Sequence, residues 1–330
     1  MLSLFKNTPA MYKSYSDCSG CSLCLLVCPV WRQSRDISLT PHGHAKALQH
    51  GNSAAEVAAS VGHCTLCMAC EPVCPENIDI IGMILELRRQ LDAPTWLRSL
   101  QDRMNERAVH PIASLPSSST MLLPDNALHE HPDTLARIVT LLGTTLSEDD
   151  GSDISLAIES GAAIPKQRLQ RFLAPLRQPR KIIVADGLLL RHLKQWLPNA
   201  NIIGLGEALS GHADVRRGLR ATDLYVIEPR AYHSDYQLMV KHYDRLRAAH
   251  GCAFNLDLQR IAIPATARNL PQRLGLIASD DDGQTRWMLH GRNIARIVVE
   301  SMEDRAALEK ASSFPVVHLA DLVDDGLMLK

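Results

Sequence analysis

Two stretches of sequence organise this chain, CSGCSLCLLVCP at residues 18–29 and CTLCMACEPVCP at residues 64–75. Each has the spacing C-x2-C-x2-C-x3-C-P, and together they hold eight of the nine cysteines. Three thiolates at three-residue steps can surround one face of a cubic iron-sulfur cluster. The fourth cysteine, which precedes a proline, points away and ligates the other cluster of a pair. The spacing therefore predicts two 4Fe-4S clusters as cofactors.

The same rule predicts which cysteines share a cluster, because the fourth cysteine of each run crosses over. Cluster 1 is expected on Cys18, Cys21, Cys24 and Cys74, and cluster 2 on Cys64, Cys67, Cys70 and Cys28. All eight are predicted metal ligands, and no catalytic residue is assigned. The alternative is a pair of four-cysteine zinc sites, but zinc sites use separated C-x2-C pairs. Disulfides are disfavoured because a reduced cytosolic chain keeps clustered thiols for metal or redox chemistry.

Length and composition restrict the class of protein. A chain of 330 residues with 46% hydrophobic residues is long enough for about two domains with a substantial core. The 35 basic and 36 acidic residues nearly balance, so nothing indicates a nucleic-acid partner. No run reaches the roughly 18 apolar residues of a membrane span, and residues 1–16 lack the apolar core of a signal peptide. We expect a cytoplasmic protein, with docking on a membrane subunit at the inner face of the membrane as an option.

The two cysteine runs are predicted to belong to one all-helical domain over residues 1–92. Residues 29–63 contain helix signals, including the turn at residues 40–43 and a capping box from Ser53 to Glu56. Ile80, Ile84, Leu87 and Leu91 then form one helical stripe that is expected to pack over the clusters.

Four histidines lie close to this domain in sequence, namely His42, His44, His50 and His63. Both cysteine sets are already complete, so we expect none of these imidazoles to be a ligand. His63 precedes Cys64 directly and is the candidate for tuning the second cluster by hydrogen bonding or charge.

The remainder of the chain is expected to form a helical connector over residues 93–180 and an α/β domain over residues 181–330. Helices are predicted near residues 133–142 and 165–176, and an acidic, solvated loop at residues 148–151. Short apolar segments after Lys181 predict mostly parallel strands. These strands are expected at residues 181–185, 201–205, 223–228, 274–278, 295–300 and 316–319, with helices near residues 188–196 and 236–249. The Gly204-x-Gly206 pair lacks the third glycine of a nucleotide-binding loop and lies on the second expected strand, so it is only a weak signal for nucleotide binding. The predicted fold class is thus α+β multidomain.

The region from Cys18 to about Leu91 resembles the dicluster domain of the heterodisulfide reductase family, which is shared with the iron-sulfur subunits of glycolate oxidase and anaerobic glycerol-3-phosphate dehydrogenase. The resemblance rests on the two cysteine runs with TPHG and NIDI. Relatives often have an arginine where this chain has His42. In this family a dicluster domain is often followed by two cysteine-rich CCG repeats. Here GEALSGH at residues 206–212 and the segments TDLYVIEPRAYHSDY, NIARIVVESMED and FPVVHLADLV resemble those repeats without their cysteines.

The lost thiolates imply a function in electron transfer, because Cys252 alone cannot hold a substrate-handling cluster. We expect an iron-sulfur subunit that relays electrons between a partner dehydrogenase, most simply a flavoprotein, and a quinone or other acceptor. Residues 181–330 are then expected to be a separable docking scaffold. Two alternatives stay open, a self-contained reductase with a substrate pocket in the C-terminal domain and a redox-sensing assembly protein. The sequence leaves open whether the chain is itself an enzyme.

Overall fold

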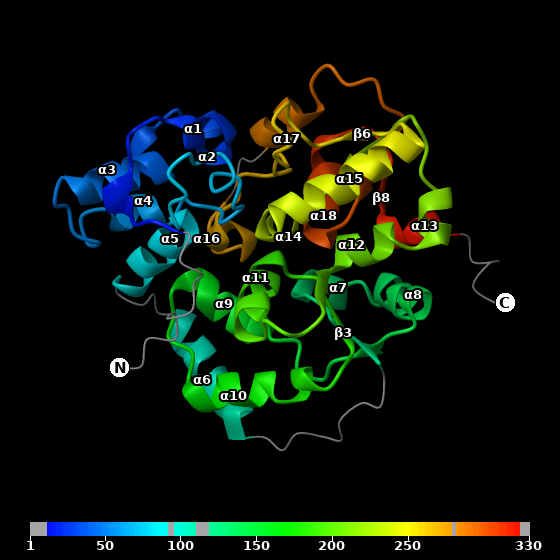
Figure 1. Ribbon diagram of the computed structural model, residues 1–330, viewed down its shortest axis with the longest axis horizontal. Coiled ribbons are helices and arrows are strands. Elements are labelled where there is room, and N and C mark those ends of the chain that lie inside the picture. Colours follow the sequence, from blue (N-terminus) through cyan, green and yellow to red (C-terminus); the bar gives the residue numbers. More distant parts are fainter. Residues whose placement is uncertain (1–11, 92–95, 110–118, 279–281, 324–330) are drawn as a thin grey trace.

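The computed structural model describes residues 12–91, 96–109, 119–278 and 282–323. A helical module comes first in the chain, and two four-stranded sheets follow it (Figure 1). Every strand pairing within these two sheets is parallel. The expected combination of a helical N-terminal region with parallel sheets is therefore confirmed.

The helical module contains five short helices that surround the two cysteine runs. They are α1 (Leu23–Val27), α2 (Pro29–Ser34), α3 (Pro41–Gln49), α4 (Ala58–Val61) and α5 (Ile80–Arg89). Helix α5 is capped by Asp79, whose Oδ1 accepts a hydrogen bond from Gly82 N at 2.9 Å. Three of the four residues of the predicted stripe are buried, with Ile84 fully inaccessible and Leu87 4% exposed, and Leu91 beyond the helix is partly buried. The stripe therefore faces the core of the molecule.

The first sheet has the strand order β2-β1-β3-β4. Its strands are β1 (Thr120–Leu123), β2 (Thr145–Leu146), β3 (Lys181–Val184) and β4 (Ile202–Gly204). Its helices are α6 (Trp96–Val109), α7 (Asn126–His129), α8 (Pro132–Leu142), α9 (Ser152–Ser160), α10 (Lys166–Leu173), α11 (Gly187–Trp196), α12 (Leu205–Ser210) and α13 (Ala213–Arg217).

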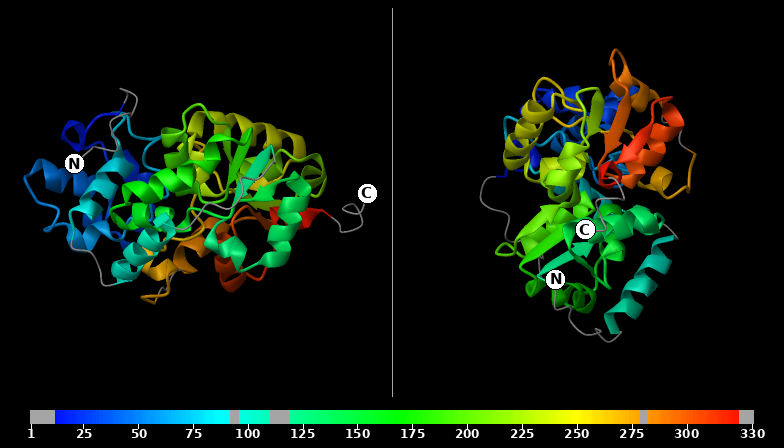
Figure 2. Two further views of the ribbon diagram at one scale, coloured as in Figure 1. Left: turned by 90° about the horizontal axis from the view of Figure 1, so that it is seen from below. Right: turned by 90° about the vertical axis from the view of Figure 1, so that its right-hand side faces the viewer.

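The second sheet repeats this order as β6-β5-β7-β8. Its strands are β5 (Asp223–Val226), β6 (Ala253–Phe254), β7 (Arg296–Val299) and β8 (Val316–His318). Its helices are α14 (Pro229–Ser234), α15 (Tyr236–His250), α16 (Leu270–Arg273), α17 (Asp282–Leu289) and α18 (Met302–Ala311). In both sheets the first strand in sequence is internal. The second strand in sequence pairs with one side of it, and the third pairs with its other side and is followed by the fourth. The two halves are thus topological repeats, and Figure 2 shows the two sheets side by side in its right-hand view.

The repeat starts earlier in the chain than the sequence suggests. Strand β1 pairs with β3 along its whole length, from Thr120 opposite Lys181 to Leu123 opposite Val184. The expected connector over residues 93–180 therefore carries two strands of the first sheet, and a boundary at residue 181 passes through that sheet. These strands are four and two residues long. Strand β2 is too short to show a strand period. Strand β1 is as long as β3 but was assigned to the connector, so its length does not explain the difference.

Two local predictions also differ from the structure. Residues 274–278 form no strand, because α16 ends at Arg273 and the chain turns at Gly275 with φ +69°. The acidic loop is not simply solvated, since Asp149 binds the fully buried guanidinium of Arg168 at 2.6 and 2.7 Å. A buried cation needs such partners.

One hydrophobic core joins the helical module to the first sheet. Ile81 and Ile84 of α5 belong to the same buried cluster as Ile182 and Val184 of β3 and Leu188 of α11. The two parts of the chain are therefore not separate globules. Within the described ranges, no helix is long and apolar enough to cross a membrane.

Candidate iron-sulfur site

Four cysteines from both runs meet around one small cavity. Cys18, Cys21, Cys24 and Cys74 line a space of about 30 Å³, which is closed on the other side by residues of α3 and α5. Burial raises the pKa of the Cys24 thiol to about 12, and the neighbouring Cys18, Cys21 and Cys74 act in the same direction. The fourth cysteine of the second run thus lies among the first three of the first run. Cys21 is the exposed member of this group.

The other four cysteines form a second, more buried group. Burial raises the pKa of the Cys28 thiol to about 12, and the charges of Cys67 and Cys64 act in the same direction. Cys70 also lies near Cys67 and Cys64, and burial is the main reason that its pKa is well above the usual range. Cys28, Cys64 and Cys70 are buried, whereas Cys67 is partly exposed. Cys28 of the first run thus lies near Cys64 and Cys67 of the second run.

The backbone of the two runs repeats an unusual conformation. Gly20 and Ser22 have φ of +79° and +65°, and the equivalent Leu66 and Met68 have φ of +53° and +64°. Leu66 and Met68 are fully buried side chains for which positive φ costs energy. Such turns point successive backbone N–H groups into an anion-binding concavity, a device found at iron-sulfur sites. Both runs therefore have the backbone form that an anionic cluster requires.

The thiol groups fit a cluster better than a single ion. All nine cysteines are free of disulfide bonds. In the portion of the chain that is described, no group of three or more His, Cys, Asp or Glu side chains has an arrangement that could hold one metal ion. A four-iron cubane is larger than one tetrahedral zinc, so its thiolates are held further apart.

Three donors from other elements hold the second run through its carbonyl groups. Arg88 Nη2 donates to Cys64 O at 2.6 Å, and Arg230 Nη2 donates to Thr65 O at 2.7 Å. His233 Nδ1 lies 2.8 Å from Cys67 O. His233 Nε2 accepts from Ala262 N at 3.2 Å, so the proton is on Nδ1 and the imidazole donates. The sequence analysis named none of these three residues, because α14 is far from the second run in sequence and no local pattern marks Arg88 as a donor to Cys64 O.

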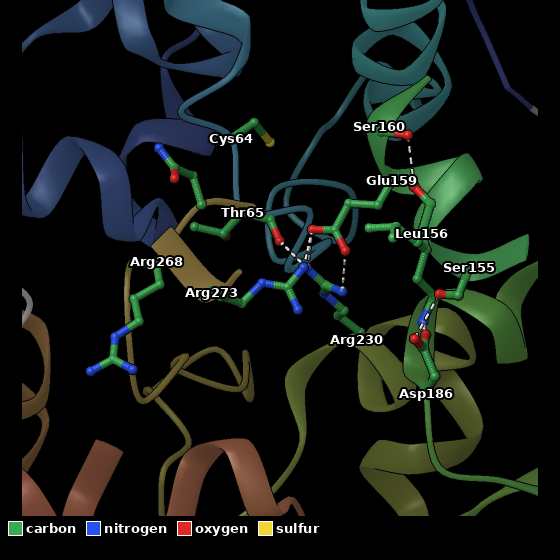
Figure 3. Close-up of polar contacts among 12 residues, drawn as sticks. Cys64, Thr65, Ser155, Leu156, Glu159, Ser160, Asp186, Arg230, Arg268 and Arg273 are labelled. Atoms are coloured by element: carbon green, nitrogen blue, oxygen red, sulfur yellow. Dashed lines mark hydrogen bonds and ion pairs between the residues drawn. The ribbon is translucent and has the colours of Figure 1, made fainter. Parts of the chain in front are cut away.

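Glu159 of α9 joins these donors in a buried ion-pair network. It accepts from Arg230 at 2.8 and 3.1 Å and pairs with Arg273 (Figure 3). Burial alone raises the pKa of Glu159, but Arg230 and Arg273 outweigh this effect and hold it well below its usual range. Arg88 Nη1 also donates to Glu159 O at 2.6 Å. The loop of the second run is therefore connected to both sheets.

The four histidines noted in the sequence take different positions. His50 is exposed at the C-terminal end of α3. His63 is exposed, and its Nδ1 lies 3.1 Å from the carbonyl oxygen of Ala59, one turn earlier in the chain. His42 lines the cavity of the first cysteine group. His44 is buried, with Nε2 3.0 Å from Ser60 Oγ, and burial followed by the Arg88 charge lowers its pKa to about 4. The imidazole that holds the second run is that of His233.

A further cavity of about 170 Å³ lies where the carboxyl ends of both sheets meet. Its wall includes the residues Asp125, Asp186, Glu228 and Ser301, which follow β1, β3, β5 and β7. Cys67 forms another part of that wall. Strand order reverses between β1 and β3 and between β5 and β7, and such switch points are the usual ligand sites of parallel sheets.

The helix ends at this cavity are already capped. The side chains of Asp125, Asp186, Glu228 and Ser301 accept hydrogen bonds from the first backbone N–H groups of α7, α11, α14 and α18. A phosphate group binds to such N–H groups when they are free. These capped N–H groups are therefore not free to bind a phosphate group.

Comparison with known proteins agrees with the N-terminal geometry. Residues 14–78 match the family model of the 4Fe-4S dicluster domain. No match to a curated protein or to a solved structure was found for the chain. The match covers both cysteine runs, and it supports a ferredoxin-like module that binds 4Fe-4S clusters and transfers electrons.

Proposed function

We propose that this chain is an electron-transfer subunit that carries two 4Fe-4S clusters with crossed ligands. Cys18, Cys21, Cys24 and Cys74 hold the first cluster, and Cys64, Cys67, Cys70 and Cys28 hold the second. The observation that carries the proposal is the grouping of the fourth cysteine of each run with the first three of the other. When bound, each cluster accepts and releases one electron. The protein binds the clusters, excludes water and sets their potentials.

The electron partners are proposed from the position of the two groups. The first group includes the exposed Cys21, and Leu23, two residues later in the chain, is 37% exposed. This side suits contact with a partner dehydrogenase, which we take to be a flavoprotein, and the acceptor is a quinone or another redox protein. The repeated strand order of the two sheets supports the interpretation that they are CCG-type repeats that lack their cysteines.

Metal analysis of the anaerobically purified chain tests this proposal. We expect about eight irons and about eight acid-labile sulfides per chain. About four irons, or zinc in place of iron, would contradict it. Copurification with a flavoprotein would identify the donor, and an isolated chain with no redox partner would argue against a subunit role.

The cavity beside Cys67 supports a second candidate function, the reduction of a small polar molecule by the chain itself. Ala127 lines this cavity, so Ala127→Trp would fill it. The low-molecular-mass fraction of a cell extract should reoxidise the dithionite-reduced wild type but not this variant. Ala136→Trp, on the exposed face of α8, is the matched control. Equal reoxidation of both variants would contradict this second function and leave electron transfer as the proposed function.

A further inference from the structure

The second cysteine run is surrounded by more buried positive charge than the first. Arg88 is 7% exposed, and the side chain of Arg230 is 12% exposed. Both guanidinium groups donate to carbonyls of the Cys64–Cys67 loop, at 2.6 and 2.7 Å. Arginine stays charged in proteins, so both contribute a fixed positive charge.

Neighbouring acids offset this charge only in part. Glu159 pairs with Arg230 and Arg273, and Glu303 also pairs with Arg273. Arg88 reaches only the backbone oxygen of Glu159. Glu71, next to Cys70, is paired with Arg191. These contacts leave an excess of cations at the loop.

Arg32 adds a further cation from another direction. It lies on α2, with its guanidinium 3.7 Å from the ring centre of Trp287, and its charge acts on Cys28 and Cys67. The second group therefore has cations from α2, α5 and α14 around it.

The first group has a simpler environment. Lys46 Nζ donates to Cys18 O at 2.9 Å, which corresponds to the Arg88 contact with Cys64. Glu76 lines the cavity and is paired with Lys13 at 3.1 Å. The two runs thus share one cation at their first cysteine, and the second group has Arg230 and Arg32 in addition. Of these two, Arg230 comes from α14, an element of the second sheet.

We propose that Arg230 raises the reduction potential of the second cluster and so makes it the electron-accepting end of the pair. Reduction adds one negative charge to a cluster, and burial opposes that charge. A nearby cation in a medium of low dielectric constant stabilises the reduced form and offsets the burial. The C-terminal half thereby sets the direction of electron flow, from the exposed first cluster inward. This inference rests on the proposed function only for the presence of the two clusters.

A redox titration followed by electron paramagnetic resonance tests the role of Arg230. Arg230→Gln should decrease the reduced-to-oxidised ratio of the second cluster at a fixed potential by on the order of tenfold, about 59 mV for one electron. The first cluster should be unchanged. Arg230→Lys keeps the charge and should retain most of the potential. Arg296→Gln is the control, because Arg296 is similarly buried and forms three hydrogen bonds at the opposite end of the second sheet.

A second variant separates charge from structure. Arg273 pairs with Glu159 and Glu303 and lines the same cavity as Cys67, so its charge acts on the cysteine loop without a hydrogen bond to it. Arg273→Gln leaves Glu159 less compensated, so it should lower the potential of the second cluster by a smaller amount. A merely structural Arg230 predicts no shift in Arg273→Gln.

The outcomes distinguish this inference from the proposed function. Iron and sulfide counts on the wild type decide first whether two clusters are present. With both present, an unchanged second potential in Arg230→Gln, or in Arg273→Gln should Arg230→Gln not fold, overturns the inference and leaves the proposed function intact.

Discussion

At the scale of single residues, the crossed ligand set makes a specific prediction about Cys74. This residue lies with Cys18, Cys21 and Cys24 although more than 40 positions separate it from them in sequence. Cys74→Ser should therefore alter the same paramagnetic signal as Cys21→Ser. Cys28→Ser should share its lost signal with Cys67→Ser.

If Cys74→Ser instead shared its altered signal with Cys67→Ser, and Cys28→Ser with Cys21→Ser, each run would hold its own cluster. Because all of these variants remove one thiolate, differences in their spectra report which cluster is affected. Cys252→Ser is the control, since that thiol is buried in the core of the second half and should change neither signal.

Glu300 predicts a pH dependence of stability. This carboxyl is 4% exposed and accepts hydrogen bonds from Tyr225 and Tyr243 at 2.7 and 2.6 Å. Burial raises its pKa to about 7, although the two tyrosines act in the other direction. The folded state thus holds this proton more tightly than the unfolded state, whose pKa is near 4.5. The contribution of this group to stability is fully present below pH 4.5 and is lost as the pH rises through 7.

Glu300→Gln removes that proton equilibrium and keeps the shape of the side chain. Relative to the variant, the wild type should lose up to about 3 kcal/mol of unfolding free energy between about pH 4.5 and pH 8. Urea unfolding at about pH 5 and pH 8 measures this. Buried histidines such as His192 and His318, whose pKa values burial lowers to about 4, act in the opposite sense, but they are common to both proteins. Parallel pH profiles would contradict the prediction.

At the scale of elements, the contact between α9 and α5 depends on Gly161. This residue ends α9 with φ +79°, and a Cβ there would lie 2.5 Å from the backbone carbon of Arg88 and 2.7 Å from Arg89 N. Gly143 ends α8 with φ +57°, but a Cβ there would have no atom within 4 Å. The two glycines therefore share a backbone requirement and differ in their packing.

Gly143→Ala should cost only the left-handed conformation, about 1 to 2 kcal/mol. Gly161→Ala should cost clearly more, because α9 must also move away from α5 and from the Arg88 hydrogen bond to Glu159 O. Chemical unfolding of both variants measures the difference. Equal costs would mean that the close approach of α9 to α5 adds nothing to the requirement for glycine.

At the scale of the whole molecule, the shared core predicts that the helical module does not fold separately. A fragment of residues 1–180 loses β3 and β4 from the first sheet, and it loses Leu188 of α11 from the core that covers α5. It should therefore hold less iron per chain than the full protein. A fragment of residues 1–222 keeps the whole first sheet and should retain the first cluster. Equal iron content and thermal stability in the 1–180 fragment and the full chain would contradict this prediction and show that the helical module folds separately.

The sequence by itself determined the ligand pattern and the local helical pattern. Cysteine spacing within a single turn is a local property, and so is the stripe that includes Ile80 and Ile84. Five of the six strands expected after residue 180 were located for the same reason, since β3, β4, β5, β7 and β8 are short apolar runs bounded by turns. The strand expected at residues 274–278 was wrong because its apolar residues are not part of a sheet.

Only the tertiary structure decided what surrounds the second cysteine run and where the first half begins. Arg230 meets Thr65 across 165 positions and His233 meets Cys67 across 166, and no local pattern encodes a contact at that separation. The two-residue strand β2 is a strand only because β1 supplies its hydrogen-bond partners. Positive φ at Leu66 and Met68 is likewise unfavourable locally and persists because the packed surroundings impose it. Local cysteine spacing thus predicts the ligands, and packing between distant segments determines their environment.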